Sequence, residues 1–233
     1  MTSGLGQYPD ITVAGGFGSA NALAELSRLA PEADVLVDFT TGSAAPELLL
    51  AAAEAGLHVV SGTSGLKPEA LNDLDKALRK AGRGGLWAAN FAIGAALMMH
   101  FARVAARFMD AAEIIELHHD KKVDAPSGTA VQTARDIRQA RGTDVPDPQV
   151  ERWTLEGARG AVDGGVRIHS VRLPGLNAHQ EVLFGSVGQI LSIRHDALGR
   201  EAYLPGVALA VREVPKRVGL VRGLDTLMGL ANG

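Results

Sequence analysis

The fold is decided by residues 35–65, which have the sequence VLVDFTTGSAAPELLLAAAEAGLHVVSGTSG. The segment opens with an apolar run, Val35–Val37, that ends in polar residues up to Thr41, as in a buried parallel strand. A helical stretch follows over Ala44–Ala55, and His58–Gly65 then repeats the pattern of an apolar run ending in small polar residues. Together these segments predict a βαβ unit with parallel strands.

The same alternation continues after this unit. Pro68–Ala81 has leucines at helical spacing, and Leu86–Ala89 is a further short apolar run. Such alternation predicts a Rossmann-like, doubly wound parallel sheet of the α/β class, which binds ligands beyond the carboxyl ends of its strands. The polar strand ends at 38–41 and 61–65 are therefore expected to line a ligand crevice.

The N-terminal part begins with a related pattern. Ile11–Ala14 is expected to form a strand that enters a tight loop at Gly15–Gly18, and Ala20–Leu29 has leucines at helical spacing. With Asn21, the loop has the form G-x-x-G-x-x-N, a partial match to a dinucleotide-binding loop. A simple tight turn explains these glycines equally well.

The second half of the chain has a different pattern. A long helix is expected after Asn90 and Phe91, up to Phe108, followed by a strand over Ala112–His119 and a helix over Thr129–Arg141. Glycine-rich turns then separate apolar segments that are typical of antiparallel strands. These strands, and a last helix, are expected over Gly164–Leu173, Gln180–Gly185, Ile190–His195 and Tyr203–Val214. The pattern predicts an α+β domain with a mixed sheet.

Composition and charge exclude several classes of protein. Lys and Arg number 23 and Asp and Glu number 26, a net charge of −3 without blocks of like charge, which disfavours an electrostatic nucleic-acid binder. The absence of cysteine removes disulfide scaffolds, thiolate metal sites and thiol nucleophiles. The most apolar stretch, Leu86–Phe101, is interrupted by Asn90 and His100, and the first ten residues lack the features of a signal peptide. We therefore expect a cytoplasmic protein without membrane contacts.

The greatest density of chemically active side chains lies in residues 113–130, EIIELHHDKKVDAPSGTA. Ser127 is a candidate helix N-cap, and Gly128 and Thr129 would follow in the first helical turn. Free backbone N–H groups and the helix dipole favour an anion at such a position. The segment therefore predicts a site for a carboxylate.

Proton donors precede this anion site. Lys122 supplies a point charge or a proton, and His118 or His119 titrates near neutrality. Two histidines at a strand end more often serve loop solvation or core hydrogen bonding. Neighbouring strand residues also point to opposite faces and no third ligand is suitably spaced, so we expect no metal site. The combination with an anion site predicts proton-assisted chemistry on a small acidic molecule.

The same segment resembles the dihydrodipicolinate reductase family of bacterial lysine and diaminopimelate synthesis. The resemblance rests mainly on residues 116–130, ELHHDKKVDAPSGTA, which form a long and specific motif. It extends over roughly residues 34–230 through shorter motifs at Val37–Thr40, Gly62–Gly65, Ala89–Phe91, Gly94, Arg172, Gly175, His179–Glu181, Ile193–His195 and Pro205–Gly206.

The resemblance implies a nucleotide-binding domain of residues 1–91 and 204–233 and, between them, a substrate-binding and tetramerisation domain of residues 92–203. In the family, NADH or NADPH reduces a cyclic imine dicarboxylate, so the implied substrate is 4-hydroxy-tetrahydrodipicolinate or a close relative. A homotetramer is also implied. By position, the catalytic residues would be His118 and Lys122, the substrate-binding residues His119, Ser127, Gly128 and Thr129, and the cofactor-binding residues Gly62, Thr63, Ala89 and Phe91.

The N-terminus departs from the family pattern, in which a strand runs into a G-x-x-G-x-x-G loop that binds a pyrophosphate. In one alignment, the strand at Ile11–Ala14 and its loop correspond to that motif, with Gly15 and Gly18 as candidate cofactor-binding residues. In the other, which the spacing to the next strand favours, this strand is the family's second, and the first strand, loop and helix are missing. Such a truncated or degenerate loop is expected to weaken binding of NADH or NADPH.

Three functional hypotheses follow from this departure. The first is a reductase that binds its nicotinamide cofactor through an altered loop. The second is a cofactor-independent relative that uses His118 and Lys122 for dehydration or isomerisation of a related cyclic acid. The third is an inactive homologue that binds a ligand or a partner.

Overall fold

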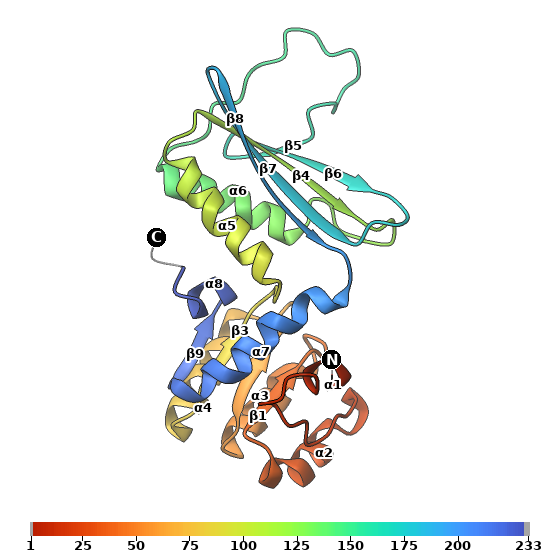
Figure 1. Cartoon of the computed structure of the whole chain (residues 1–233), viewed down its shortest axis with the longest axis vertical. Coiled ribbons are helices and arrows are strands. Elements are labelled where there is room, and N and C mark those ends of the chain that lie inside the picture. Colours follow the sequence, from red (N-terminus) through yellow and green to blue (C-terminus); the bar gives the residue numbers. More distant parts are fainter. Residues whose placement is uncertain (1, 231–233) are drawn as a thin grey trace. The chain divides into compact units, whose positions relative to one another are not determined.

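The computed structural model describes residues 2–230 and divides into two compact units (Figure 1). Of the described residues, unit 1 comprises 2–93 and 201–230, and unit 2 comprises Gly94–Arg200. Each unit has its own β-sheet and its own hydrophobic core. None of the helices in the described part of the chain is long and apolar enough to cross a membrane.

Unit 1 is built on a parallel sheet with the strand order β1-β2-β3-β9. The strands are β1 (Val35–Asp38), β2 (His58–Ser61), β3 (Gly84–Trp87) and β9 (Gly219–Arg222). Every residue of β2 is buried, as expected for a central strand that is covered on both faces. The parallel sheet and the helices between its strands confirm the predicted Rossmann-like α/β fold.

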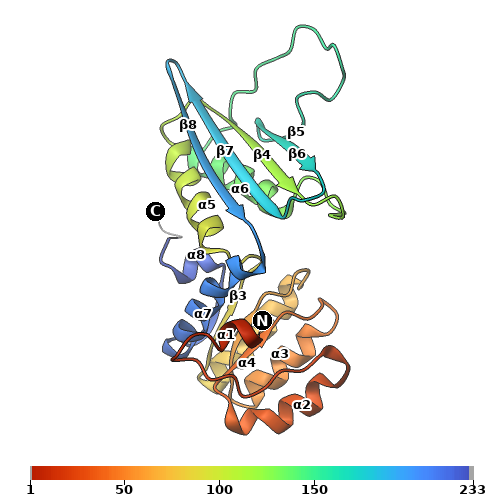
Figure 2. The same ribbon diagram turned by 45° about the vertical axis from the view of Figure 1, so that its right-hand side comes forward.

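Helices connect these strands and cover the sheet. The helices of this unit are α1 (Thr2–Leu5), α2 (Ala22–Leu29), α3 (Ala45–Glu54), α4 (Pro68–Ala81), α7 (Leu204–Glu213) and α8 (Leu224–Leu227), with short 3-10 turns at Ser19–Asn21, Ala30–Glu32, Arg200–Tyr203 and Val214–Lys216. On α4, Leu71, Leu74 and Leu78 are buried in a core shared with α2 and α3. Helix α7 packs against β2 and lies on the other side of the sheet from α3 and α4 (Figure 2). The sheet is therefore doubly wound.

The segment before α2 differs from the prediction. The expected strand at Ile11–Ala14 is absent: residues 11–18 form neither helix nor strand, and within residues 2–230 no strand pairs with the outer edge of β1. Val13 is 38% exposed, so the segment lacks the burial of a strand in a parallel sheet. Asp10 instead forms a bidentate ion pair with Arg212, which holds the segment against α7. An apolar run of four residues does not distinguish a strand from an apolar loop.

Strand β9 has no counterpart in the prediction. Its four residues, GLVR, show no alternation, and a run this short carries little strand signal. Its position is set by tertiary contacts, because Gly219 N–H donates to the Arg83 carbonyl at 2.9 Å and Gly84 then pairs with Gly219. The same pairing makes β3 begin at Gly84, before the predicted start of that strand.

Unit 2 contains a mixed sheet with the order β5-β6-β4-β7-β8. The strands are β4 (Ala111–His118), β5 (Ala161–Asp163), β6 (Val166–Arg172), β7 (Ala178–Ser186) and β8 (Gln189–Ala197). The central strand β4 is antiparallel to β7 and parallel to β6, which confirms the predicted mixed sheet, although β6 was expected among the antiparallel strands. The long connection from β4 through a helix and a loop allows a crossover, and a crossover yields a parallel pair.

The predicted strand over 164–173 corresponds to β6, and a turn at its start separates β6 from β5, which the sequence did not predict. Gly164 and Gly165 have φ values of 58° and 85°, which disfavour any residue with a side chain. A Cβ atom at Gly165 would lie 1.7 Å from the carbonyl oxygen of Val145. Backbone packing at this turn therefore requires glycine.

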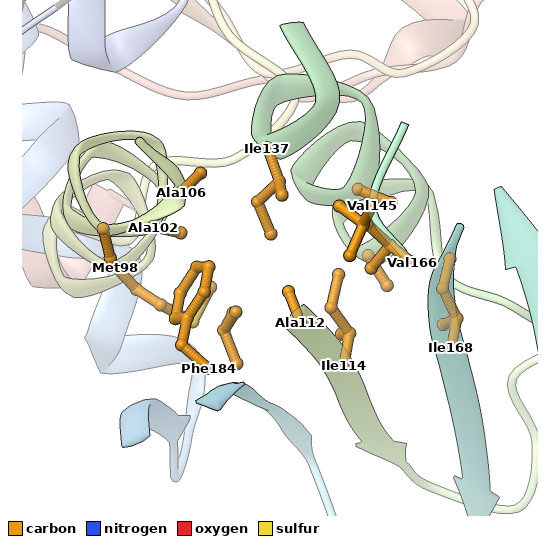
Figure 3. Close-up of a cluster of buried hydrophobic side chains, with 14 residues drawn as sticks. Met98, Ala102, Ala106, Ala112, Ile114, Ile137, Val145, Val166, Ile168 and Phe184 are labelled. Atoms are coloured by element: carbon orange, nitrogen blue, oxygen red, sulfur yellow. The ribbon is translucent and has the colours of Figure 1, made fainter. Parts of the chain in front are cut away.

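The core of unit 2 lies between the sheet and two helices, α5 (Ile93–Ala106) and α6 (Gly128–Arg141). Figure 3 shows Phe184 and Ile137 pointing into this core from β7 and α6. The α5 side chains that face it include Ala102, whose small size allows close helix approach. Because both helices cover the same face, they bury the inward residues of β4, and no helix of unit 2 within residues 94–200 covers the other face of the sheet.

Buried His58, at the start of β2, gives unit 1 a sensitivity to acid. Its Nδ1 accepts the Gly84 N–H at 2.9 Å, and burial lowers its pKa. Since the folded-state pKa is depressed, this stabilisation is complete above the unfolded pKa of about 6.5 and is lost as pH falls through the folded pKa. We expect His58→Asn, whose Oδ1 can accept the same N–H but cannot be protonated, to flatten the dependence of unfolding free energy on pH below that value. Urea unfolding at neutral and acidic pH measures this, and an unchanged slope would exclude a contribution from His58.

Candidate active site

The candidate active site of unit 2 lies at the carboxyl end of β4. On the inward face of this strand, Ala112 and Ile114 belong to the core, and Glu116 and His118 continue the same face toward the strand end. Arg172, the last residue of β6, lies opposite His118. The side chains on one face of β4 are therefore apolar in the core and polar at the carboxyl end of the strand.

Glu116 is the centre of this cluster and is 0% exposed. Its Oε1 accepts hydrogen bonds from Arg172 Nη2 at 2.8 Å and from the Ser127 N–H at 3.2 Å. Its Oε2 accepts from Arg172 Nη1 at 2.9 Å and lies 2.5 Å from His118 Nδ1. The bidentate guanidinium pair and the two further contacts offset the cost of burying the carboxylate charge.

The pKa values in the cluster are set by burial and by these contacts. Burial alone would raise the pKa of Glu116, but hydrogen bonds from Arg172 and His118 outweigh it, so this pKa lies below its ordinary value. Burial lowers the pKa of His118, while Glu116 opposes that change and Lys122 and Arg172 add to it. An ionised Glu116 and a predominantly neutral His118 are therefore expected at neutral pH.

The loop after β4 brings Lys122 to this cluster. The Lys122 N–H donates to the carbonyl of exposed His119 at 3.2 Å, and its Nζ donates to Asp124 Oδ1 at 2.7 Å. The Lys122 charge holds the pKa of Asp124 below its ordinary value. The Asp124 carbonyl accepts from Arg172 Nη2 at 2.7 Å, which ties the loop to the end of β6.

Helix α6 begins directly after this loop, and Ser127 is its N-cap. The Ser127 Oγ accepts the Ala130 N–H at 3.3 Å, and the Ser127 carbonyl accepts the Val131 N–H at 3.1 Å. The N–H groups of Gly128 and Thr129 belong to the first turn of the helix, before the Ala130 N–H that Ser127 caps. The space beside Gly128 is open, because a Cβ atom there would have no heavy atom within 4 Å. The open first turn therefore has backbone donors and a favourable dipole for an anion.

A second polar cluster occupies the strand ends of unit 1, around buried Asp38. The Asp38 Oδ1 accepts the Thr40 N–H at 2.9 Å and the Thr40 hydroxyl at 2.6 Å. Its Oδ2 accepts the Ser61 hydroxyl at 2.7 Å and the Thr63 hydroxyl at 2.8 Å. One carboxylate thus orients the polar side chains that follow both β1 and β2.

Aromatic rings lie beside these strand ends. A Cβ atom at Gly62 would lie 2.1 Å from Phe39 Cε1, so the Phe39 ring packs directly over the Gly62 backbone. The Phe39 ring is also 5.5 Å from that of buried Phe91, centroid to centroid, and exposed Ala89 follows the end of β3. Carboxyl ends of parallel strands are where open α/β sheets bind ligands.

The structure brings the predicted site residues together in two groups, one in each unit. Unit 2 holds His118, His119, Lys122, Ser127, Gly128 and Thr129 around the end of β4 and the start of α6, and unit 1 holds Gly62, Thr63, Ala89 and Phe91 at its strand ends. Gly15 and Gly18 lie in the irregular segment before α2, not in a loop between a strand and a helix. Across the described residues, no group of three or more His, Asp or Glu side chains is arranged to hold a metal ion.

Sequence reasoning gave no organising role to Glu116 or Asp38: Glu116 is part of the family motif, and Asp38 is part of a polar strand end expected to line the crevice. The pattern EIIEL places Glu113 and Glu116 on opposite faces of β4, but it does not say which face is buried. The partner of Glu116, Arg172, is remote in sequence and ends a different strand. The only local signal for Asp38 is a charged residue that follows directly on a buried apolar run.

Comparisons with known proteins extend over both units. Residues 9–91 match the family model described as dihydrodipicolinate reductase, N-terminus, and residues 94–228 match the model described as dihydrodipicolinate reductase, C-terminus. The chain belongs to the dihydrodipicolinate reductase family. It is therefore an enzyme of the oxidoreductase class, with the two-part architecture of this family.

Individual members of this family are similar in sequence to this protein over most of its length. The 4-hydroxy-tetrahydrodipicolinate reductase of Dehalococcoides mccartyi is 46% identical over 226 residues, covering 96% of this chain and 85% of the relative. That of Shouchella clausii is 52% identical over 197 residues, covering 84% and 75%. The structure of dipicolinate-bound dihydrodipicolinate reductase from Paenisporosarcina sp. TG-14 has a TM-score of 0.80 at 41% identity, covering 89% of this chain and 77% of that chain. The comparisons do not support the cofactor-independent and inactive alternatives.

Proposed function

We propose that this protein reduces 4-hydroxy-tetrahydrodipicolinate, a cyclic imine-type dicarboxylate, with NADH or NADPH. The observation that carries this proposal is the grouping of His118 and Lys122 with the open first turn of α6, in a chain whose relatives are named for that reaction. The cytoplasmic location and the place in lysine and diaminopimelate synthesis that the sequence predicts belong to the same proposal.

The substrate carboxylate is proposed to bind at the start of α6. The N–H groups of Gly128 and Thr129 supply donors there, and the dipole of this 14-residue helix favours a negative charge. Lys122 adds a positive charge, and exposed His119 supplies a further polar contact. Support for a dicarboxylate comes from the Paenisporosarcina structure, which is described as bound to dipicolinate, itself a ring that carries two carboxylates.

His118 and Lys122 are proposed to supply the proton that accompanies the hydride. The contact of His118 Nδ1 with Glu116 leaves Nε2 as the ring nitrogen that can exchange a proton with substrate. Because the pKa of His118 lies below its ordinary value, the protonated form of its ring becomes scarcer as pH rises, and the Lys122 ammonium is a second hydrogen-bond donor. The two side chains therefore form a donor pair beside the proposed carboxylate site.

The nicotinamide cofactor is proposed to bind at the strand ends of unit 1. The residues there fit such a group: Gly62 has no side chain, so the Phe39 ring lies directly over its backbone as an apolar surface, and the Thr63 hydroxyl is held by Asp38. Ala89 and Phe91 complete this set. NADH or NADPH, when bound, supplies the hydride. Gly15 and Gly18 are not included because no strand leads into them.

We further propose that the protein assembles as a homotetramer through the sheet of unit 2. The face opposite α5 and α6 is covered by no helix of unit 2 in the described part of the chain, and it carries half-buried Ile115 and Leu183. Val162 and Ile190, on the edge strands of that face, are 52% and 79% exposed. Light scattering during size-exclusion chromatography tests this assembly, since a homotetramer has four times the 24.3 kDa mass of one chain. A mass of one chain would contradict it.

The reductase proposal is tested by following nicotinamide absorbance with freshly generated 4-hydroxy-tetrahydrodipicolinate. We expect substrate-dependent oxidation of NADH or NADPH, and micromolar binding of at least one of them in a calorimetric titration. Turnover of the substrate without any cofactor would instead support the dehydration or isomerisation hypothesis. Absence of both turnover and cofactor binding would contradict the proposed function.

A further inference from the structure

A buried carboxylate, Glu116, underlies the proposed proton donor but does not belong to the proposed substrate contacts. It is 0% exposed and follows the apolar residues Ala112 and Ile114 on the inward face of β4. A buried ion pair seldom stabilises a fold more than apolar residues of similar volume would. The contacts of Glu116, and not its contribution to stability, therefore indicate its role.

The first contact of Glu116 determines which nitrogen of His118 carries a hydrogen. Carboxylate Oε2 lies 2.5 Å from Nδ1, and an ionised carboxylate only accepts hydrogen bonds, so Nδ1 must be the donor. The neutral ring then has its hydrogen on Nδ1 and a free electron pair on Nε2. The charged ring carries its transferable proton on Nε2, where donation leaves the bond to Glu116 intact.

The other contacts of Glu116 reach the proposed anion site. Its Oε1 accepts the Ser127 N–H at 3.2 Å, directly before the first turn of α6. Arg172, which donates hydrogen bonds to both carboxylate oxygens of Glu116, also donates to the Asp124 carbonyl at 2.7 Å. Both the start of α6 and the preceding loop are therefore tied to the same carboxylate that holds His118.

We propose that Glu116 is a positioning residue that holds His118 as the Nδ1–H tautomer, with Nε2 available to donate, and aligns the start of α6 with it. This inference rests on the proposed function for its catalytic consequence. The Glu116 carboxylate thereby fixes the position of the proposed proton donor relative to the proposed binding site for the substrate carboxylate.

The charges around His118 define how Glu116 affects its titration. The groups that face the ring are Glu116 on β4, Arg172 at the end of β6 and Lys122 in the loop. Burial and the two cations lower the pKa of His118, and Glu116 alone opposes them. Removing the Glu116 charge therefore lowers this pKa further and leaves less of the protonated ring at a given pH.

The direct test is nitrogen NMR of ring-labelled histidine in wild type and in Glu116→Gln, with the His118 signals assigned by their loss in His118→Gln. In the wild type we expect neutral His118 to show a protonated Nδ1 and a bare Nε2. In Glu116→Gln we expect a mixture of tautomers and a midpoint of titration at lower pH. Identical tautomer and midpoint in both proteins would overturn the proposal. This measurement needs no substrate, so it stands even where the reductase assignment fails.

Kinetics supply the second readout. We expect Glu116→Gln to lower kcat about 100-fold, with a smaller rise in KM, and to move the alkaline fall of kcat to lower pH. Glu116→Asp keeps the negative charge. We expect it to recover part of the activity and to return the alkaline fall of kcat toward its wild-type pH. Wild-type kcat and pH profile in Glu116→Gln would contradict a positioning role.

A matched control lies on the same strand. Glu113 contacts His169 Nε2 at 2.8 Å and also pairs with Arg159, but it faces the opposite side of β4. Glu113→Gln is expected to leave the His118 tautomer and titration unchanged. Should Glu116→Gln fail to fold because Arg172 loses its partner, the double variant Glu116→Gln/Arg172→Gln removes both charges of the ion pair. It should fold and show the same altered tautomer, and a wild-type His118 signal in it would overturn the proposal.

Discussion

Replacing Lys122 with alanine is expected to lower kcat/KM of the reductase reaction by about a thousandfold. The substitution removes a proton donor and a positive charge beside the proposed carboxylate site, and general acid catalysis alone contributes about a hundredfold to ten-thousandfold. The loop itself should persist, because Lys122 is a partly exposed loop residue whose side-chain contact is an ion pair with Asp124, and such pairs contribute less than about 1 kcal/mol. Steady-state kinetics, with the unfolding midpoint as a check, measures both expectations.

The neighbouring lysine offers a matched control for this experiment. Lys121 is exposed, and Lys121→Ala changes the net charge by the same amount in the same loop. We expect its kinetics to be those of the wild type. If Lys122→Ala were fully active, Lys122 would have no part in the mechanism, and equal losses in both variants would indicate a general electrostatic effect instead.

Replacing Asp38 with alanine is expected to destabilise unit 1 by about 3 kcal/mol. The substitution leaves the buried Ser61 and Thr63 hydroxyls without their acceptor, and each unsatisfied buried polar group costs about 1–3 kcal/mol. Loss of the Thr63 orientation should also weaken nicotinamide binding. The chain has two tryptophans, so a Trp153→Phe background leaves Trp87, which donates to the Thr63 carbonyl at 2.9 Å, as a fluorescent reporter of unit 1 in urea unfolding.

Asp38→Asn shows how much of the effect comes from the negative charge of Asp38 and how much from its oxygen as a hydrogen-bond acceptor. Asp38→Asn keeps one carbonyl oxygen that can accept the Thr40 or Ser61 hydroxyl, so we expect a smaller loss of unfolding free energy than for Asp38→Ala. Cofactor affinity should follow the same order, with wild type tightest and alanine weakest. Equal stability of all three proteins would show that the Asp38 contacts contribute nothing to the fold.

Asp38 and Glu116 have the same physical role in their respective units. Each is buried at or near the carboxyl end of a strand, and each accepts at least four hydrogen bonds or close polar contacts, mainly from residues at or beyond the strand ends. Strand ends leave backbone and side-chain donors that need partners in a buried environment. A carboxylate with two acceptor oxygens fills that need and fixes the attached loops at the same time.

The fold of unit 1 was predictable where the hydrophobic period was long enough to be decisive. Helix α4 occurs over Pro68–Ala81 as predicted, because three leucines define one face and Pro68 and Gly82 suit its two ends. Ile11–Ala14 and β9 were not predictable, because a run of four residues does not by itself show whether a partner strand lies beside it. Pairing with a neighbouring strand decides such segments: β9 has β3 beside it, and Ile11–Ala14 has no strand partner in the described part of the chain.

The candidate active site was predictable to the extent that it is contiguous. Residues 118–129 hold the proposed proton donors, the loop and the helix cap within one strand–loop–helix connection, and their residue types express their chemistry. Arg172 has no such local signal, because only the parallel pairing of β4 with β6 places it opposite His118. The mixed sheet also determines that Glu116, and not Glu113, faces the core.

The sequence by itself determined the doubly wound sheet of unit 1, the mixed sheet of unit 2, the family and the segment that carries the proposed chemistry, because period and motif are local properties of the chain. The tertiary structure decided which strands pair, where the N-terminal segment lies and which carboxylates are buried. These depend on contacts between residues far apart in sequence, such as Glu116 with Arg172. A buried charge requires a partner, and only the folded chain brings that partner within hydrogen-bond distance.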